Sequence, residues 1–424
     1  MKKMIAGIMA AAMTAAAVPA FSVSAADART QKDFVLFGDS IAAGVTRDGN
    51  VEYNYGDILA DYYSGTASNY AVSGDDSDQM LAKIKALSAD QKQAVKDAEC
   101  VVISVGGNDM IYYGCRHMLN FFADNGLLND GFTKDNIPER PSLTQMKDMI
   151  KIEGEGGVRE YVSDINKGFL VVDEIRNVGL HLRYDMPDEG YEGYIKNHIM
   201  KNISEAAAEL KAINPNAKIV VQTVYQPLQI SPDFISKSPK LKSYSVVVNQ
   251  LRVTLEDIMS EFKKQVVAQS KTDGFEVADV LVDFTSQESG VIKSEKNPGH
   301  AAYFVDIEND ELTEADVHPN QKGHLAIAAN IIDVLGEKHD DGGILSDIYE
   351  NLSDKASYPA AALAKYEAAA GSWTLGDANF DGYIDARDGT KVLTGYAMSS
   401  VGKDGFRYKE KIAADVNNDG VSDG

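Results

Sequence analysis

Short apolar runs, rich in β-branched and aromatic residues, recur along the first two thirds of the chain. Five of them have the length and composition of buried β-strands. They lie at residues 34–37, 68–72, 101–105, 218–224 and 280–284. Polar, turn-forming or helical segments separate each run from the next, so the pattern predicts one sheet whose strands are far apart in the sequence.

Helical spacing of apolar residues predicts the intervening elements. Ser88 followed by Gln91 indicates a capping box at the start of a helix that runs through Val95. Residues 203–213 and 248–268 also have the apolar spacing of helices. Alternating strands and helices imply parallel βαβ units with right-handed crossovers. We therefore expect a three-layer α/β/α domain over about residues 30–340.

One segment is too long for a simple crossover. Residues 110–196 separate the third and fourth expected strands and contain polar turns, a Gly-Glu-Gly-Gly sequence and helical pieces such as residues 158–178. An insertion at the carboxyl end of a strand is well placed to form the wall of a substrate cleft. Covering the sheet edge is the alternative role.

Length and composition bound the class of protein. A chain of 424 residues exceeds one usual core, so we expect more than one domain. The formal net charge of −23 argues against nucleic acid or an anionic membrane as partner. The two cysteines, Cys100 and Cys115, are expected to be free thiols, because the chain would have to double back along a strand to join them.

The N-terminus has the features of an export signal. Lys2 and Lys3 precede an apolar stretch at residues 4–20, and Val-Ser-Ala at residues 23–25 resembles a cleavage site. We expect a signal peptide at residues 1–26. The mature protein is therefore expected to be secreted and extracellular, with a cell-surface complex as a further location. No later segment has the roughly 20 apolar residues of a membrane span.

Residues suited to ester hydrolysis follow the ends of the expected strands. Such chemistry needs a nucleophile, a base, a group that orients the base, and donors for the oxyanion. Ser40 follows the first strand, Gly74 the second and Asn108 the third, while His318 lies beyond the fifth. Because the carboxyl ends of parallel strands share one edge of a sheet, these four residues are expected to converge.

In these four blocks the chain resembles the SGNH/GDSL-type esterases. The matching segments are residues 38–40 (Gly-Asp-Ser), Gly74, residues 106–109 (Gly-Gly-Asn-Asp) and residues 318–319 (His-Pro), and the resemblance covers about residues 33–336. It implies a flavodoxin-like sheet, Ser40 as nucleophile and His318 as base. It also implies an oxyanion hole made by the N–H groups of Ser40 and Gly74 and the amide of Asn108, with no cofactor for catalysis.

The acidic residue of the triad departs from the family pattern. The family places it three residues before the histidine, where this chain has Ala315. Asp316, two residues before His318, is the preferred candidate, because residues two apart point to the same side of an extended segment. Glu314 and a backbone carbonyl remain alternatives.

Other polar residues near these blocks have lesser expected roles. We expect Asp109 to support the loop that holds Asn108, Asp39 to be a turn residue, and His324 to be structural. His117 has no partner in the sequence, and we expect no role for it.

After an Ala-rich linker at residues 341–374, the composition changes to Asp, Asn and Gly. Residues 377–388 (DANFDGYIDARD) have the spacing of an EF-hand-like calcium loop, with Gly382 at its sixth position. The expected calcium ligands are Asp377, Asn379, Asp381, Tyr383 through its carbonyl, Asp385 and Asp388.

A second copy of this loop begins at Asp415. Its ligand positions in register are Asp415, Asn417, Asp419 and Asp423, and the repeat is truncated at Gly424. The pair over residues 375–424 resembles a dockerin, an α-helical calcium module that joins enzymes to cohesin-bearing scaffold proteins. This resemblance implies calcium as a bound ion and a cohesin-bearing scaffold as partner.

Together these features predict a secreted serine esterase. Its expected substrate is an acylated plant cell-wall polysaccharide, which it deacetylates within a cellulosome-like complex. The carbohydrate assignment rests on the dockerin-like segment. A lipase or lysophospholipase acting on lipid acyl esters is one alternative, and a catalytically inactive, scaffold-associated binding protein is the other.

Overall fold

The computed structural model describes residues 31–46, 49–51, 53–226, 242–281, 307–308, 311–312, 318–319, 321–336, 378, 384 and 386–400. The expected signal peptide, the Ala-rich linker and the second calcium loop lie outside the described residues. Asp316 and Glu314 also lie outside them.

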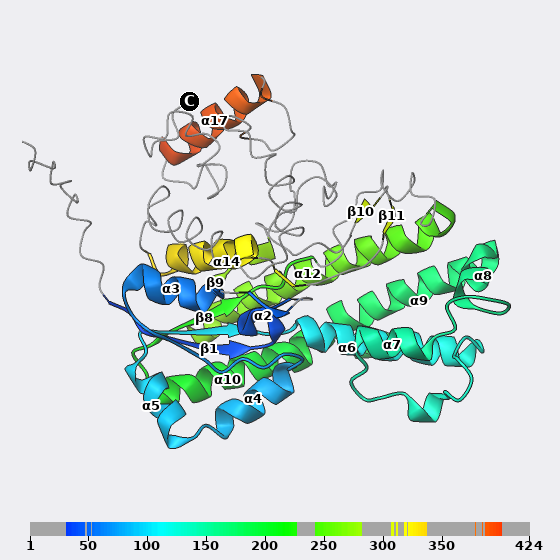
Figure 1. Cartoon of the computed structure of the whole chain (residues 1–424), viewed down its shortest axis with the longest axis horizontal. Coiled ribbons are helices and arrows are strands. Elements are labelled where there is room, and N and C mark those ends of the chain that lie inside the picture. The colour runs from blue at the N-terminus through cyan, green and yellow to red at the C-terminus, as the bar shows by residue number, and fades with distance from the viewer. Residues whose placement is uncertain are drawn as a thin grey trace, which may run out of the picture.

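Five parallel strands form the central sheet (Figure 1). Their order is β4-β1-β5-β8-β9, which is the order of flavodoxin-like sheets. The strands are β1 (Phe34–Gly38), β4 (Ala67–Asn69), β5 (Cys100–Ser104), β8 (Lys218–Gln222) and β9 (Glu276–Ala278). The first strand in sequence therefore lies between the second and third, and its carboxyl end is flanked by both of theirs.

Four of the five expected strands are confirmed, and the fifth is wrong in position. The strand is β9, whereas Val280 and Leu281 already have helical conformation. Among the described residues β9 is an edge strand that pairs with β8 alone, and it begins at the exposed Glu276. Val280, the first residue of the expected run, is apolar because it is fully buried in the core that it shares with α14 (Gln321–Val334).

Helices cover both faces of the sheet, as the expected three layers require. Alternate residues along β1 divide between two cores, with Leu36 on one side and Val35 on the other. The first core packs α3 (Tyr55–Tyr63) and α14 against the sheet. On the opposite face lie α4 (Ser77–Lys85), α5 (Ala89–Asp97) and α10 (Met200–Ile213) (Figure 1).

Side-chain caps fix the starts of several helices. The predicted capping box is confirmed, because the Gln91 N–H donates to Ser88 Oγ and the Ser88 N–H donates to Gln91 Oε1. The expected long helix at 248–268 is α12 (Ser245–Asp273). The helical piece expected at 158–178 is two helices, α8 (Val158–Ser163) and α9 (Ile165–Arg183). Asp164 separates them because its carboxylate accepts the N–H groups of Asn166 and Lys167.

The insertion between β5 and β8 is mainly helical. It includes α8 and α9, and α9 packs along α12. Its other elements are α6 (Gly107–Asp124), η1 (Lys134–Asn136), α7 (Leu143–Met149), β6 (Asp185–Met186), η2 (Pro187–Glu189), β7 (Tyr191–Glu192) and the π-helical turn η3 (Ile195–Ile199).

Short elements complete the described structure. They are α2 (Ser40–Ala43), the β2 (Val45–Thr46) and β3 (Gly49–Asn50) hairpin, η4 (Lys242–Tyr244), the β10 (Ile307–Glu308) and β11 (Glu311–Leu312) hairpin, and α17 (Ala386–Ser400). Cys100 and Cys115 are both free and buried, as predicted. Within the described ranges, no helix has the length and apolar character needed to cross a bilayer.

Candidate active site

A tight turn at the end of β1 presents Ser40. A Cβ atom on Gly38 would lie 2.1 Å from the carbonyl oxygen of Ser104 in β5, so only glycine fits this close approach of two strands. The Asp39 N–H then donates to that same carbonyl at 3.1 Å. The Asp39 carboxylate accepts the Ile41 N–H at 3.0 Å and caps α2. Ser40 is therefore the first residue of a short helix, held at the carboxyl edge of the sheet.

His318 meets Ser40 across the fold. Its Nε2 atom lies 2.9 Å from Ser40 Oγ, although the two residues are 278 positions apart in the sequence. This is the hydrogen-bond distance expected of a nucleophile and its general base. Ser40 is only 9% exposed, so surrounding protein groups shield most of this residue from bulk water.

Gly74 lies on the loop after β4, and Asn108 lies in the first turn of α6, which follows β5; these two strands flank β1. One N–H of the Asn108 side-chain amide donates to the Asp75 carbonyl at 2.9 Å, which leaves the second N–H of that amide for another acceptor. The Tyr112 hydroxyl donates to the Gly74 carbonyl at 2.7 Å. In the described part of the chain, neither the Ser40 nor the Gly74 N–H donates to a protein group. These are the three donors expected of the oxyanion hole.

Two glycines precede Asn108 at the start of α6. Gly106 has φ +116°, and a Cβ atom there would lie 2.7 Å from the Phe262 ring. At Gly107 a Cβ atom would lie 3.8 Å from Asp39 Oδ2. Gly106 therefore allows the start of α6 to pack closely against Phe262 of α12, whereas the distance at Gly107 is an ordinary van der Waals contact.

A buried carboxylate ties the start of α6 to the start of α4. Asp109 accepts both the N–H and the hydroxyl of Ser77, the latter at 2.5 Å. Asn202 of α10 donates in turn to Ser77 Oγ at 2.9 Å. Burial raises the pKa of Asp109 to about 6, against the opposing effect of the Ser77 hydrogen bonds. This network fixes the end of the Gly74 loop where α4 begins, so Asp109 does more than support Asn108.

Asp39 is buried beside the catalytic pair. Burial raises the pKa of its carboxyl to about 7, and the Ile41 N–H and the nearby His318 offset this effect only in part. Near neutral pH the carboxyl is therefore partly protonated. Asp39 is more than a turn residue, since its ionisation changes the electrostatic field at His318.

His324 anchors the helix that follows His318. Its Nδ1 accepts the Tyr55 N–H at 3.3 Å, and its ring stacks on Tyr55 at 5.9 Å between centroids. Burial lowers the pKa of His324 to about 3, so the ring is neutral and can accept at Nδ1. The contact ties α14 to the start of α3 and so helps to place His318.

The structure describes the expected calcium loop only at a few positions. Asp388 is buried in the first turn of α17, and Ala378 is also buried. The other five expected ligands of this loop, and all four of the second, lie outside the described residues. Among the described residues, no group of three or more His, Cys, Asp or Glu side chains is placed to hold a metal ion.

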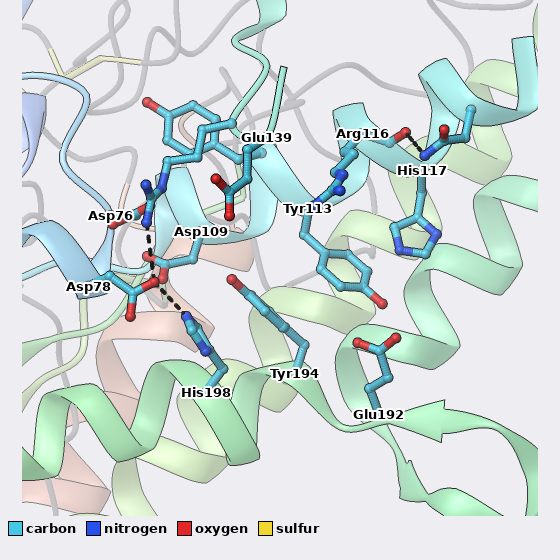
Figure 2. Close-up of a pocket in the computed structure, with 13 residues that line it drawn as sticks. Asp76, Asp78, Asp109, Tyr113, Arg116, His117, Glu139, Glu192, Tyr194 and His198 are labelled. Carbon is cyan, nitrogen blue, oxygen red and sulfur yellow. Dashed lines mark hydrogen bonds and ion pairs between the residues drawn. The ribbon is translucent and has the colours of Figure 1, made fainter. Parts of the chain in front are cut away.

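A hollow of roughly 490 Å³ beside the oxyanion loop was not predicted from the sequence. One face of α6 forms its floor (Figure 2). The residues of this face are Asp109, Tyr112, Tyr113, Arg116, His117 and Asn120. Their spacing of three and four residues is the signal that could have found them, because such positions share one helix face. His117, which had no expected role, is among them.

A family model identifies the chain. The model of the GDSL-like Lipase/Acylhydrolase family matches residues 36–326, well over half of the 424 residues. The chain belongs to this family. The protein is therefore an ester hydrolase by family, with an α/β fold and a parallel sheet.

Solved structures of low sequence identity are also similar to the chain. Phospholipase A1 from Streptomyces albidoflavus NA297 is 13% identical, with a TM-score of 0.40, over 72% of this chain and 99% of that one. An extracellular lipase from Streptomyces rimosus is 15% identical, with a TM-score of 0.40, over 72% and 98%. A GDSL-like lipase from Bacteroides thetaiotaomicron is 13% identical, with a TM-score of 0.33, over 72% and 88%. The search of curated proteins gave no significant match.

We expect Asn108→Ala to lower kcat for a small ester by about 10²–10³-fold with little change in KM, because the lost amide N–H stabilises only the oxyanion. Steady-state kinetics with 4-nitrophenyl acetate measure this effect. The thermal midpoint checks that loss of the amide contact with Asp75 leaves the fold intact. A kcat within about fivefold of wild type in a folded variant would remove Asn108 from the oxyanion hole.

The pKa of Asp39 predicts a pH-dependent stability. Because the folded-state pKa is about 7 and the ordinary value is about 3.9, the folded protein binds this proton more tightly. The free energy of unfolding therefore falls as pH rises from 4 to 7 and levels off above it. Asp39→Asn lacks this loss, so its stability relative to wild type should rise by up to about 4 kcal/mol between pH 4 and 8.

Urea unfolding at several pH values measures the difference. Asp130→Asn changes an exposed loop carboxylate and is the matched control. The assignment fails when the stability difference for Asp39→Asn follows the same pH course as that of the control.

Proposed function

We propose that this ester hydrolase is a secreted serine esterase that removes acetyl or similar small acyl groups from plant cell-wall polysaccharide. The 2.9 Å contact between Ser40 Oγ and His318 Nε2 carries the proposal, and the expected oxyanion donors Ser40, Gly74 and Asn108 support it. The reaction needs no metal or organic cofactor, since the protein itself supplies the nucleophile, the base and the donors.

In the proposed reaction, Ser40 Oγ attacks the ester carbonyl and His318 Nε2 takes its proton. The developing oxyanion accepts hydrogen bonds from the Ser40 and Gly74 N–H groups and from the Asn108 amide. His318 then gives the proton to the departing sugar oxygen, which leaves an acyl group on Ser40. A water molecule, deprotonated by His318, hydrolyses this acyl-enzyme and restores the serine.

Orientation of His318 requires a partner for its second ring nitrogen. We propose Asp316 for this role, with Glu314 or a backbone carbonyl as the alternatives. Asp39 acts differently, because its carboxylate caps α2 and influences His318 through its charge.

The dockerin-like segment supports the carbohydrate substrate and the scaffold partner. Its first loop ends in α17, which starts at Ala386 and contains Asp388 in its first turn. A helix in this position agrees with a helix after an EF-hand-like loop. We propose that residues 377–388 bind calcium, that the second loop contributes its ligands from Asp415 onward, and that the module binds a cohesin-bearing scaffold.

A substrate panel tests the enzymatic proposal. Wild type should release acetate from acetylated xylan and cleave 4-nitrophenyl acetate faster than a long-chain 4-nitrophenyl ester. Ser40→Ala should lower both activities by at least about 10³-fold, whereas Ser163→Ala, an exposed serine on α8, should leave them unchanged.

Each contrary result supports a named alternative. A preference for long-chain esters would favour the lipase or lysophospholipase. Absence of any Ser40-dependent hydrolysis would favour an inactive binding protein associated with a scaffold.

Calorimetric titration of the full chain tests the calcium proposal. Asp381→Ala should weaken calcium binding at least about tenfold, because it removes a charged oxygen ligand from the first loop. Asp404→Ala, which lies between the two loops in the sequence, is the control. Equal calcium affinity of the Asp381 variant and wild type would refute the loop assignment.

A further inference from the structure

Polar and aromatic side chains line the hollow along α6. We call it the α6 hollow, defined by the α6 face from Asp109 to Asn120 together with Arg140, Glu192 and Tyr194 on the facing segments (Figure 2). Arg140, Glu192 and Tyr194 belong to the insertion between β5 and β8. Among the described residues no aliphatic side chain lines the hollow, and polar atoms make up more of its surface than apolar atoms, which suits a polar ligand better than a long acyl chain.

The α6 hollow begins at the oxyanion loop. Tyr112 lines it and at the same time donates its hydroxyl to the carbonyl of Gly74. Asp76, two residues after Gly74, lines it as well. From Asp109 to Asn120 the helix extends roughly 16 Å. A ligand whose ester carbonyl lies at Gly74 can therefore continue along α6 away from the reacting atoms.

Three acidic side chains of the hollow are already held by neighbours, and one of them is Asp109, which accepts the hydrogen bonds of Ser77. Arg140 contacts the Asp76 carboxylate and also reaches Asp78 Oδ2 at 3.3 Å. His198 lies 3.0 Å from the same Asp78 oxygen. These contacts join the insertion to the start of α4 and fix the shape of the hollow where it meets the oxyanion loop.

The remaining polar groups supply both acceptors and donors. Glu139 and Glu192 are exposed carboxylates, and Glu192 lies 4.0 Å from His181 Nδ1. Arg116 and Asn120 offer N–H groups from α6, although one amide N–H of Asn120 already donates to the Arg116 carbonyl at 2.9 Å. A neutral polyhydroxylated ligand uses both kinds of group, because each hydroxyl donates and accepts. An anionic ligand fits poorly, since five carboxyl side chains and only two guanidinium groups line the hollow.

The aromatic residues do not form a cage for an organic cation. Tyr113 stacks on His117 at 4.3 Å between centroids and lies 4.6 Å from Tyr194, which stacks on His198 at 4.6 Å. The faces of the Tyr113 and Tyr194 rings are therefore covered by neighbouring aromatic rings. A quaternary ammonium ion needs open ring faces, whereas this column offers ring edges, hydroxyls and imidazole nitrogens.

We infer that the α6 hollow binds the sugar portion of the substrate, as a neutral carbohydrate chain attached to the ester that reaches Ser40. This inference rests on the proposed function and assigns its polysaccharide specificity to the insertion. Carboxylates on Glu139 and Glu192 accept sugar hydroxyls, while Arg116 and Asn120 donate to sugar oxygens. The acyl group itself lies outside the hollow, at the Ser40 turn.

The test compares two ester substrates in the double variant Glu139→Gln/Glu192→Gln. One substrate is 4-nitrophenyl acetate, which has no sugar. The other is an acetylated oligosaccharide, used as separate xylan-derived and glucomannan-derived preparations. We expect kcat/KM for the oligosaccharide to fall by at least about tenfold and kcat/KM for the aryl acetate to stay within about twofold.

Glu155→Gln is the matched control, because Glu155 is an exposed glutamate of the same insertion outside the hollow. It should leave both activities unchanged. As a second measurement, calorimetry with the deacetylated oligosaccharides in a Ser40→Ala background should show binding that the double variant weakens by a similar factor.

The outcomes separate this inference from the proposed function. Loss of Ser40-dependent hydrolysis of both substrates in wild type would overturn the esterase itself. Equal effects of the double variant on the two substrates would overturn the sugar-binding role and leave the esterase intact. Aryl acetate hydrolysis without acetate release from either oligosaccharide would also overturn the sugar-binding role.

Discussion

The close approach of Gly38 to the Ser104 carbonyl is the constraint on which the site depends. Because no side chain fits between the ends of β1 and β5, the chain can turn at once and Asp39 can donate to the same carbonyl. The Asp39 carboxylate then starts a helix at Ser40. A nucleophile on such a turn has its position set by backbone contacts, so its hydroxyl stays free for His318.

The other side of the site depends on packing between distant segments. His318 precedes α14, whose apolar face belongs to the same core as β1 and α3. His324 fixes this helix further by accepting the Tyr55 N–H. The energy that brings His318 to Ser40 therefore comes from burial of α14 rather than from the single hydrogen bond between them, which contributes only about 1 kcal/mol.

The sequence predicted the features that come from burial and from local motifs. The central strands β1, β5 and β8 are buried and apolar, and the residues at their carboxyl ends lie together as the parallel topology requires. The sequence placed the fifth strand at residues 280–284 instead of at β9. An edge strand needs less apolar surface than a central one, so β9 gave a weak signal, whereas Val280 is apolar because it packs in the core with α14. The split at Asp164 was missed because a capping carboxylate leaves the apolar spacing unchanged.

The α6 hollow was missed for a different reason. Its wall combines one face of α6 with Arg140 and Glu192, which only the tertiary fold brings together. This arrangement separates the positioning of the reacting groups from the proposed binding of the rest of the substrate. The ends of β1, β4 and β5 fix the reacting groups through backbone geometry that tolerates little change, whereas the hollow uses exposed side chains of an insertion. Substitutions in the insertion can therefore alter which alcohol portion is accepted while the oxyanion donors keep their positions. The bond between Asp109 and Ser77 joins the starts of α6 and α4, next to those donors, independently of Glu139 and Glu192.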